Sequence, residues 1–594
     1  MPSMRRWAGV VALLVVSLLL PPSVAGATTA PDFSFAGHGW GHGVGLSQYG
    51  AKAMAADGAT YQQIIHRYFT GVSVVPLSAA SPGAYVTTNP RPIWVGLLQD
   101  QTGVTFTVQE GSAQLCFDDP SLCVRTVGTG ETWRFGPDAS GGCVFQKARG
   151  DGRFRPVGAT RSCSASVRPA STGSTVKVPF KARSYRNGNL RFRPSALPGR
   201  LHVVFETGLE PYLKGLSEVP EAWPRAAIEA QVVTVRSATA WHLLDNGPVE
   251  QFDPGPNADC FCNLRDGGQD PVFRGASGED AHENWVAAVE ATRSQVIRTP
   301  SGIALGMYSS SSGGITENYA DVFSGLTFPH LVSVADSAAF SDSAGNPHTQ
   351  WAAGYGQDRL AATFGFTWVS NVTVVERNES GSVRTVLIEG IYDGRPAEKL
   401  VSGVEIQTAL SLRSTTFDVT VTPTFSDVLP TDQFAGEILG LADLGITAGC
   451  DATRFCPRDG ITRGEMAAFL VRALDLGSPT TTDPFEDDDS SVFENDIEVL
   501  HSHGVTKGCA SNLFCPEGLV SRGEMAAFLV RAFDLPASAG NPFTDDDGSF
   551  FEADIAALEA SGVTSGCSPG HFCSDRAVSR QEMAAFLIRV LATA

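Results

Sequence analysis

The sequence has no surplus of positive charge and little long apolar sequence. It carries 43 Lys and Arg against 63 Asp and Glu, which gives a formal net charge of -20. There is no basic stripe to neutralise phosphates, so the composition argues against a nucleic-acid partner. The one apolar run, near the N-terminus, is shorter than the ~20 residues that a membrane-spanning helix needs, and no other long apolar stretch is present. An acidic chain of this kind can still bind a glycan or a cell-wall polymer.

The N-terminal residues predict an export signal. Arg5 and Arg6 precede a short apolar run over 10–20, and small residues form a cleavage site that ends at Ala27. We expect residues 1–27 to be removed as a signal peptide, which leaves a secreted protein at the cell wall surface without a transmembrane anchor. An uncleaved anchor is the alternative.

The length of the chain predicts several domains.

All 12 cysteines follow this segment, their number is even and they fall in local pairs. Such usage is typical of an oxidising compartment. One spacing recurs three times near the C-terminus, which predicts the pairs Cys450/Cys456, Cys509/Cys515 and Cys567/Cys573. The remaining neighbours are Cys116/Cys123, Cys143/Cys163 and the C-x-C pair Cys260/Cys262. The sequence alone leaves the connectivity of these six open.

The stretch GLSEVPEAWPRAAIEAQVVTVRSATAWHL, over 215–243, places one acid ahead of a long helix. Apolar residues recur at helical spacing from Ala227 to Thr239. A carboxylate held at the rigid start of such a helix, here Glu218, can keep a raised pKa and act as a general acid. The alternative is a structural role, in which Glu218 caps the helix or pairs with Arg225.

Three motifs together resemble the SpoIID/LytB family of peptidoglycan-acting proteins. They are the EVP, WP and AQxxxxR elements of that helix stretch, FAGHGWGHGVGLSQYGA over 35–51, and MYSSSSGGITE over 307–317. The resemblance implies a mixed α/β, β-rich catalytic domain over 28–422. A disulfide-bearing β insertion is expected at about 91–170 within it.

The order of the motifs looks circularly permuted relative to that family. In most members the glycine-rich block would follow the closing strands of the domain, whereas here it lies near the N-terminus. The permutation predicts that residues 33–35 pack or pair beside residues 416–421. That contact would restore one site from the two ends of the domain.

The resemblance also implies the residues of that site. Glu218 is the expected catalytic acid. Polar side chains of the two loop motifs are the expected substrate ligands, namely His42, Ser47, Gln48, Tyr308, Ser310, Thr316 and Glu317. Glu317 is either a second, electrostatic carboxylate or a structural one, and an ordinary Ser/Gly loop remains the alternative for its motif.

No cofactor is expected. His38 and His42 lie in a glycine-rich loop with no adjacent third ligand, so they do not predict a metal site. Some family members carry a Cys/His zinc site in the region of Cys260 and Cys262. No clean C-x2-C…H pattern is present there, and a local disulfide or structural thiols are favoured over structural zinc.

The last part of the chain is an internal repeat with a period of about sixty residues. It resembles three S-layer homology (SLH) modules, predicted as small all-α units over 423–480, 481–538 and 539–594. A Ser or Thr with Glu three residues later forms a capping box at each second helix. The arginines between them are candidates for gripping an anionic secondary cell-wall polymer; these are Arg463, Arg522 and Arg580. Otherwise they are solvated or pair with nearby acids.

The resemblance thus predicts a secreted, wall-anchored lytic transglycosylase. It would cleave MurNAc–GlcNAc bonds of peptidoglycan strands and leave 1,6-anhydro-MurNAc ends. Some relatives are described as amidase enhancers, so the alternative is a non-catalytic peptidoglycan-binding protein with a cell-wall amidase as partner. A purely structural S-layer component would leave the glycine-rich block unexplained. Sporulation, division and general wall remodelling stay open as the process.

Overall fold

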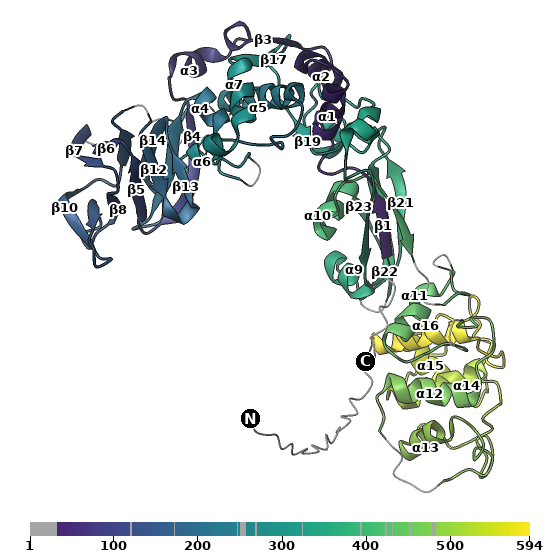
Figure 1. The fold of residues 1–594 in the computed structure, drawn as a ribbon. Helices are drawn as coiled ribbons and strands as arrows, with labels where there is room; N and C mark the ends of the chain where they lie inside the picture. The colour runs from purple at the N-terminus through teal and green to yellow at the C-terminus, as the bar shows by residue number, and fades with distance from the viewer. Residues whose placement is uncertain are drawn as a thin grey trace, which may run out of the picture.

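The computed structural model describes residues 33–593 except for short gaps. The gaps are 119–120, 172, 246, 250–252, 254–256, 268–269, 324, 393–394, 422–424, 430–431, 452–453 and 478–482. The predicted signal peptide lies outside the described residues. The chain forms an elongated arc, with a β-rich module at one end and the helical repeats at the other (Figure 1). Within the described part of the chain, no helix is both long and apolar enough to cross a bilayer.

The β-rich module consists of two sheets that share one hydrophobic core. The first has the order β16 (Leu264–Arg265), β4 (Ile93–Gln101), β15 (Leu201–Thr207), β14 (Gly188–Pro194), β11 (Ala165–Pro169), β6 (Ser112–Asp118), β7 (Ser121–Gly128). The second has the order β10 (Phe154–Arg161), β9 (Cys143–Ala148), β8 (Thr132–Pro137), β5 (Val104–Glu110), β12 (Thr175–Val178), β13 (Arg183–Tyr185). Disulfides Cys116–Cys123 and Cys143–Cys163 lie within it. Its strands continue to residue 207, beyond the predicted 91–170 insertion.

The centre of the arc is built around α5 (Arg225–Asp245), which is buried along most of its length. Small side chains such as Ala230 let neighbouring elements approach it closely. Its neighbours are α1 (Gln48–Ala56), α2 (Tyr61–Tyr68), α3 (Gly83–Thr88), α4 (Leu209–Lys214), α7 (Glu283–Ala291), β17 (Gln295–Thr299) and β18 (Gly302–Ile303). Helix α6 (Ala276–Ala281) precedes α7, and β3 (Ser73–Pro76) pairs with β17. Arg236 of α5 is fully buried and donates to Glu210 at 2.8 Å, so this motif arginine is a structural residue.

The two ends of the permuted domain meet in one sheet, as the motif order predicted. Strand β1 (Phe33–Gly37) pairs antiparallel with β24 (Phe417–Val421) on one side and with β20 (Trp351–Tyr355) on the other. In Figure 1 the purple β1 stands among green strands from the far end of the domain. A second sheet, β21 (Trp368–Arg377), β22 (Val383–Tyr392) and β23 (Arg395–Ser402), shares its core with α9 (Gln357–Phe364) and α10 (Gly403–Leu410).

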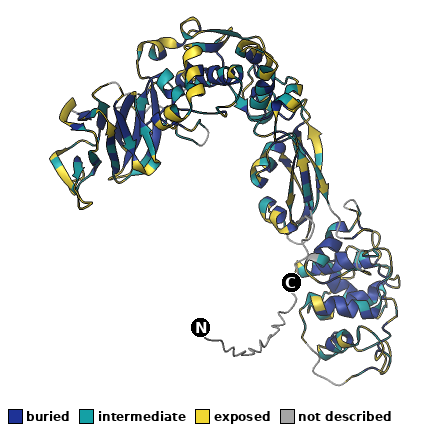
Figure 2. Cartoon of the chain, viewed as in Figure 1, coloured by how far each residue is buried: buried dark blue, intermediate teal, exposed yellow. Residues whose placement is uncertain are grey.

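The C-terminal part forms three repeats that close on one another. The helices are α11 (Ala435–Asp443), α12 (Arg463–Ala473), α13 (Glu494–Ser502), α14 (Arg522–Ala532), α15 (Glu552–Ala560) and α16 (Arg580–Leu591). Helix α12 packs on α13, α14 on α15, and α16 on α11, so each repeat contributes its second helix to the next. Their buried residues form one shared core, drawn dark blue in Figure 2.

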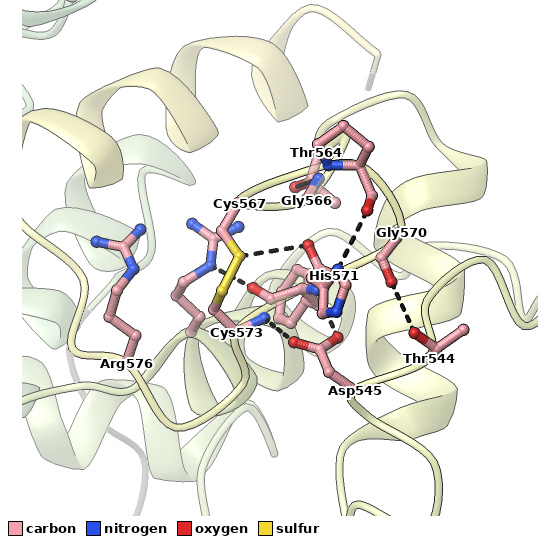
Figure 3. The surroundings of a disulfide bond; sticks show 12 residues. Thr544, Asp545, Thr564, Gly566, Cys567, Gly570, His571, Cys573 and Arg576 are labelled. Atoms are coloured by element: carbon pink, nitrogen blue, oxygen red, sulfur yellow. Dashed lines mark hydrogen bonds between the residues drawn. A yellow bond between two sulfur atoms is a disulfide. The ribbon is translucent and has the colours of Figure 1, made fainter.

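Each repeat contains the disulfide predicted from the recurring spacing: Cys450–Cys456, Cys509–Cys515 and Cys567–Cys573. In the third repeat the Asp545 carboxylate accepts from the backbone N–H groups of Phe572 and Cys573, at 2.7 and 2.8 Å (Figure 3). The disulfide loop is therefore tied to the start of its repeat. The capping boxes are also present at the starts of α12, α14 and α16.

Candidate active site

Glu218 lies in the turn between α4 and α5, and its side chain lines a cavity of about 320 Å³. Tyr308, from strand β19 (Tyr308–Ser309), donates its hydroxyl to Glu218 Oε2 at 2.9 Å. Burial raises the pKa of the Glu218 carboxyl, while the Tyr308 hydrogen bond and the charge of Arg274 act in the opposite direction. The net effect favours the neutral acid, which is the form that can donate a proton.

The glycine-rich block reaches this cavity through a close backbone contact. Strand β2 (Leu46–Ser47) pairs in parallel with β19. Gly45 stands just before it with φ of +76°, and a Cβ on this residue would lie 2.3 Å from the Met307 carbonyl oxygen. Only glycine fits this approach. It brings Gln48 to the backbone of Glu218, where Gln48 Nε2 donates to the Glu218 carbonyl at 3.1 Å.

His42 lines the same cavity as Glu218. Its Nδ1 accepts from the backbone N–H of Val44 at 3.0 Å, which fixes the ring in the loop. Burial lowers the pKa of His42 to about 4, so the imidazole is neutral near pH 7. The backbone of Tyr308 makes a second hydrogen bond to the ring, so His42 is a neutral residue that joins the two loops beside the cavity.

Other predicted ligands have structural partners elsewhere. Ser47 is the N-cap of α1 and accepts from the backbone of Gly50. Thr316 is fully buried and accepts from the backbone N–H of Val334 at 2.9 Å. Glu317 is 2% exposed and accepts from the Ser380 hydroxyl at 2.7 Å. These three side chains do not line the cavity, and their hydrogen bonds hold the loops together; for Glu317 this fits the structural alternative.

Ser310 contributes through its backbone. Its carbonyl accepts from the N–H of Tyr49 at 3.1 Å, and this bond joins the serine-rich loop to the start of α1. The two family-like loops are thus hydrogen-bonded to each other beside the cavity.

Sequence reasoning missed a second carboxylate of the cavity, Asp270. It lines the cavity together with Glu218, His242 and Tyr212. Burial raises the pKa of Asp270, and its carboxylate accepts from the backbone N–H of Arg265 at 2.7 Å. Burial lowers the pKa of the neighbouring His242. Asp270 lies in an irregular loop with no motif around it, so only the tertiary fold brings it to Glu218.

A row of aromatic rings leads from the glycine-rich block toward the helix start. Ring centroids are 4.5 Å apart for Trp40 and His348, 5.5 Å for His348 and Tyr49, and 5.1 Å for Tyr49 and Trp223. Trp40 is 49% exposed. Exposed aromatic faces of this kind can pack against the apolar faces of sugar rings. Trp223 lies five residues after Glu218, at the approach to α5.

Cys260 and Cys262 are joined in a disulfide, packed beside Trp94. A disulfide removes both thiolates that a zinc site would need. The suggestion of structural zinc at this pair is therefore wrong, and the local disulfide favoured by the sequence is confirmed.

The three repeat arginines are buried at the junctions between repeats. Their Nε atoms donate to carbonyls of the next repeat at 2.8 Å: Arg463 to Phe514, Arg522 to Phe572 and Arg580 to Phe455. Each also faces a capping-box glutamate of that neighbour: Glu524, Glu582 and Glu465. Arg522 and Arg580 are 2% and 3% exposed. Their guanidinium groups link the repeats, which fits the alternative that these arginines pair with acids of the protein.

Two surface cavities lie between the repeats and have cationic linings. One, of about 560 Å³, is lined by Arg463, Lys507 and Arg531 with the exposed Phe550. The other, of about 510 Å³, includes Arg458 and Arg576. These side chains offer positive charge at the surface, which the buried Arg522 and Arg580 do not.

Comparison with known families agrees with the motifs. Residues 198–298 match the family model described as SpoIID, Stage II sporulation protein. Residues 424–467, 484–526 and 542–584 each match the S-layer homology domain. The chain therefore carries a SpoIID domain, which includes Glu218 and α5, and three S-layer homology domains. The SpoIID domain indicates a peptidoglycan-related function, and the S-layer homology domains indicate association with the cell wall.

Parts of the chain are similar to several curated proteins. It is 45% identical over 42 residues to the amidase enhancer of Bacillus subtilis (strain 168), which is 7% of this chain and 6% of that protein. It is 31% identical over 110 residues to an endoglucanase of Bacillus sp. (strain KSM-635), 18% of this chain and 12% of the relative. The S-layer protein sap of Bacillus anthracis is 32% identical over 124 residues, 20% of this chain and 15% of the relative. Each match thus spans less than a fifth of the relative's length.

Proposed function

We propose that this protein is a secreted lytic transglycosylase that cleaves the glycan strands of peptidoglycan, with Glu218 as its catalytic acid and base. The observation that carries the proposal is the half-buried Glu218, held by Tyr308 in a cavity that also receives the glycine-rich block. A structural cap would pair with a cation or a helix N-terminus, whereas burial here raises the pKa of the carboxyl.

The reaction needs one carboxyl group in two states. Neutral Glu218 donates its proton to the glycosidic oxygen as the bond between that oxygen and C1 of MurNAc breaks. The resulting carboxylate takes the proton of the MurNAc C6 hydroxyl, whose oxygen bonds to C1 and closes the 1,6-anhydro ring. No water enters, so one carboxyl serves both steps, unlike the carboxylate pairs of hydrolysing glycosidases.

Neighbouring side chains have supporting roles in this proposal. The Tyr308 hydroxyl stabilises the Glu218 carboxylate between the two proton transfers. Asp270 lines the same cavity, and burial raises its pKa as it does that of Glu218, so we assign it no charge-stabilising role. The row of rings from Trp40 to Trp223 offers stacking surfaces to successive sugars.

Mass analysis of products from purified glycan strands tests the proposal. Wild-type protein should release 1,6-anhydro products, which are one water lighter than the products of hydrolysis. Glu218→Gln should fold and yield none, whereas Glu283→Gln, a change of an exposed acid on α7, should retain activity. Cleavage by folded Glu218→Gln, or reducing ends in place of anhydro ends, would refute the role.

The similarity to an amidase enhancer favours a second candidate, a glycan-binding protein that stimulates a cell-wall amidase. Under this alternative, the same digest gives no anhydro products, and addition of the protein raises the rate at which a purified amidase releases stem peptides. Glu218→Gln would then leave that stimulation unchanged.

The repeats would hold the protein at the wall through an anionic polymer. Cationic side chains of the cavity near Arg463, in particular Lys507 and Arg531, are the proposed contacts in place of the buried arginines. Lys507→Glu should weaken co-sedimentation with purified cell walls. Walls stripped of their secondary polymer should bind wild type and variant equally poorly.

A further inference from the structure

In the described part of the repeats, two buried carboxylates accept no hydrogen bond from the protein. Asp488 is 0% exposed and Asp546 is 2% exposed. Both oxygens of each lack a hydrogen-bond partner among the described residues. The two residues occupy equivalent positions, directly after the aspartates Asp487 and Asp545 that hold the disulfide loops. A buried charge without a partner costs several kcal/mol, so this arrangement points to a missing counter-charge.

In the second repeat, further acids surround this carboxylate. Oxygens of Asp483, Asp488 and Asp489 all lie within 4.8 Å of one another. Glu494, in the first turn of α13, is close enough to act electrostatically on Asp488. Asp487 is not part of the group, because its oxygens accept from the N–H groups of Phe514 and Cys515. Three carboxylates thus lie together, and a fourth, from Glu494, acts on Asp488 electrostatically.

The third repeat has the same arrangement with one acid replaced by an amide. Asn541 stands where the second repeat has Asp483. Its Nδ2 donates to Asp547 Oδ1 at 2.8 Å and to Glu552 Oε1 at 3.4 Å, so these side chains meet beside Asp546. Figure 3 shows Asp545 turned toward the disulfide loop. Asp546 is instead close enough to Asp547 and Glu552 for both to act on it electrostatically.

The first repeat shows that the fold does not need these acids. Val428, Leu429 and Ala435 occupy the positions of Asp488, Asp489 and Glu494. Val428 is buried like its counterparts, at 1% exposure. Asp427 keeps the structural role and accepts from Phe455 and Cys456 at 2.7 and 2.8 Å. The disulfide loop therefore forms without these acids, so their presence in the second and third repeats needs another explanation.

We propose that the second and third repeats each bind one calcium ion, and that the first repeat binds none. The ligand groups are Asp483, Asp488, Asp489 and Glu494 in the second repeat, and Asn541, Asp546, Asp547 and Glu552 in the third. Each of these groups has an oxygen to offer, Asn541 through Oδ1 once its amide turns from the acids that Nδ2 now contacts, and oxygen suits a hard cation rather than zinc or copper. The acids come from a loop and a helix end, and such an irregular set suits the flexible coordination of calcium better than the strict octahedron of magnesium.

The ion would join two parts of each repeat. In the second repeat it would connect the loop around Phe485 to the first turn of α13, the helix that packs on α12 of the preceding repeat. Because the ion binds the folded repeat and not the unfolded chain, it should raise thermal stability. The proposal does not depend on the reaction proposed for the SpoIID domain.

Isothermal titration of the full chain with calcium chloride, after removal of metal with EGTA, tests the number of sites. We expect two ions per chain for the wild type, one for Asp488→Asn or Asp546→Asn, and none for the double variant. Glu486→Gln is the matched control, because it removes an exposed acid from the same run and should keep both ions. Absence of saturable binding, or equal loss in Glu486→Gln, would overturn the proposal.

Valine substitutions test whether a loss of calcium binding is due to misfolding. Asp488→Val with Asp546→Val copies the first repeat, so the double variant should match or exceed the wild-type Tm in EGTA. Added calcium should raise the Tm of the wild type and leave that of the variant unchanged. A calcium-dependent rise in the variant would contradict the sites. An equal rise of the wild-type Tm with magnesium would contradict the choice of calcium.

Discussion

Gly45→Ala tests whether the glycine-rich block really completes the site. An alanine at φ of +76° costs about 1–2 kcal/mol in backbone strain. Its Cβ would also lie 2.3 Å from the Met307 oxygen, so β2 must move away from β19. That movement breaks the 2.9 Å bond from Leu46 N–H to Met307, with a net loss of about 1 kcal/mol. The local cost is therefore roughly 2–3 kcal/mol.

The expected consequence is a loss of activity larger than the loss of stability. Movement of the block shifts Gln48 and His42 relative to Glu218, and a displacement of about 1 Å can cost ~10²-fold in rate. Release of anhydro products should fall by about that factor. The Tm should fall by several degrees, as a local cost of roughly 2–3 kcal/mol at this two-residue strand pair implies.

Gly58→Ala is the matched control. Gly58 has φ of +91°, but an added Cβ would meet nothing within 4 Å. It therefore carries the backbone strain without the collision, and we expect nearly normal activity. If the two variants show equal activity and equal Tm, the block does not hold the site, and the reasoning from the permuted order fails.

Three further predictions address the acid, the repeat junctions and the aromatic row. Because burial raises the pKa of Glu218 and the neutral form donates, kcat/KM should fall as pH rises through that pKa; a rate that rises with pH would contradict this. Arg580→Met should destabilise the repeats by about 3 kcal/mol, since it leaves buried partners unpaired, whereas exposed Arg576→Met should cost under about 1 kcal/mol in thermal unfolding. Trp40→Ala should weaken binding of glycan strands several-fold by fluorescence titration, while Phe180→Ala, a change of a still more exposed ring on the β-rich module, should not.

The order of the motifs allowed part of the site to be predicted. The position of the glycine-rich block near the N-terminus predicted that residues 33–35 lie beside residues 416–421, and β1 pairs with β24 there. That prediction came from the order of the motifs relative to the family they resemble. The sequence did not specify that the glycines lie against the backbone of the serine-rich loop at Met307 and Tyr308, which the structure shows.

Prediction failed where a side chain's role depends on a neighbour far along the chain. Thr316 was expected to bind sugar and Glu317 either to act as a second carboxylate or to be structural, and their partners Val334 and Ser380 come from other segments of the chain. Asp270 carries no motif, and it meets Glu218 only because the loop after β16 folds over the cavity. The sequence alone does not distinguish a polar residue that faces solvent from one that faces substrate or another loop.

The sequence by itself determined the two kinds of domain, the paired cysteines of the repeats and the capping boxes, because each depends on residues within a few positions of one another. The tertiary structure alone decided that Arg522 and Arg580 are buried, since the carbonyls they contact belong to the neighbouring repeat. It also decided that Asp488 and Asp546 are enclosed without a partner while Val428 fills the same place in the first repeat. Burial and partner choice are properties of the closed ring of repeats, and no single segment specifies them.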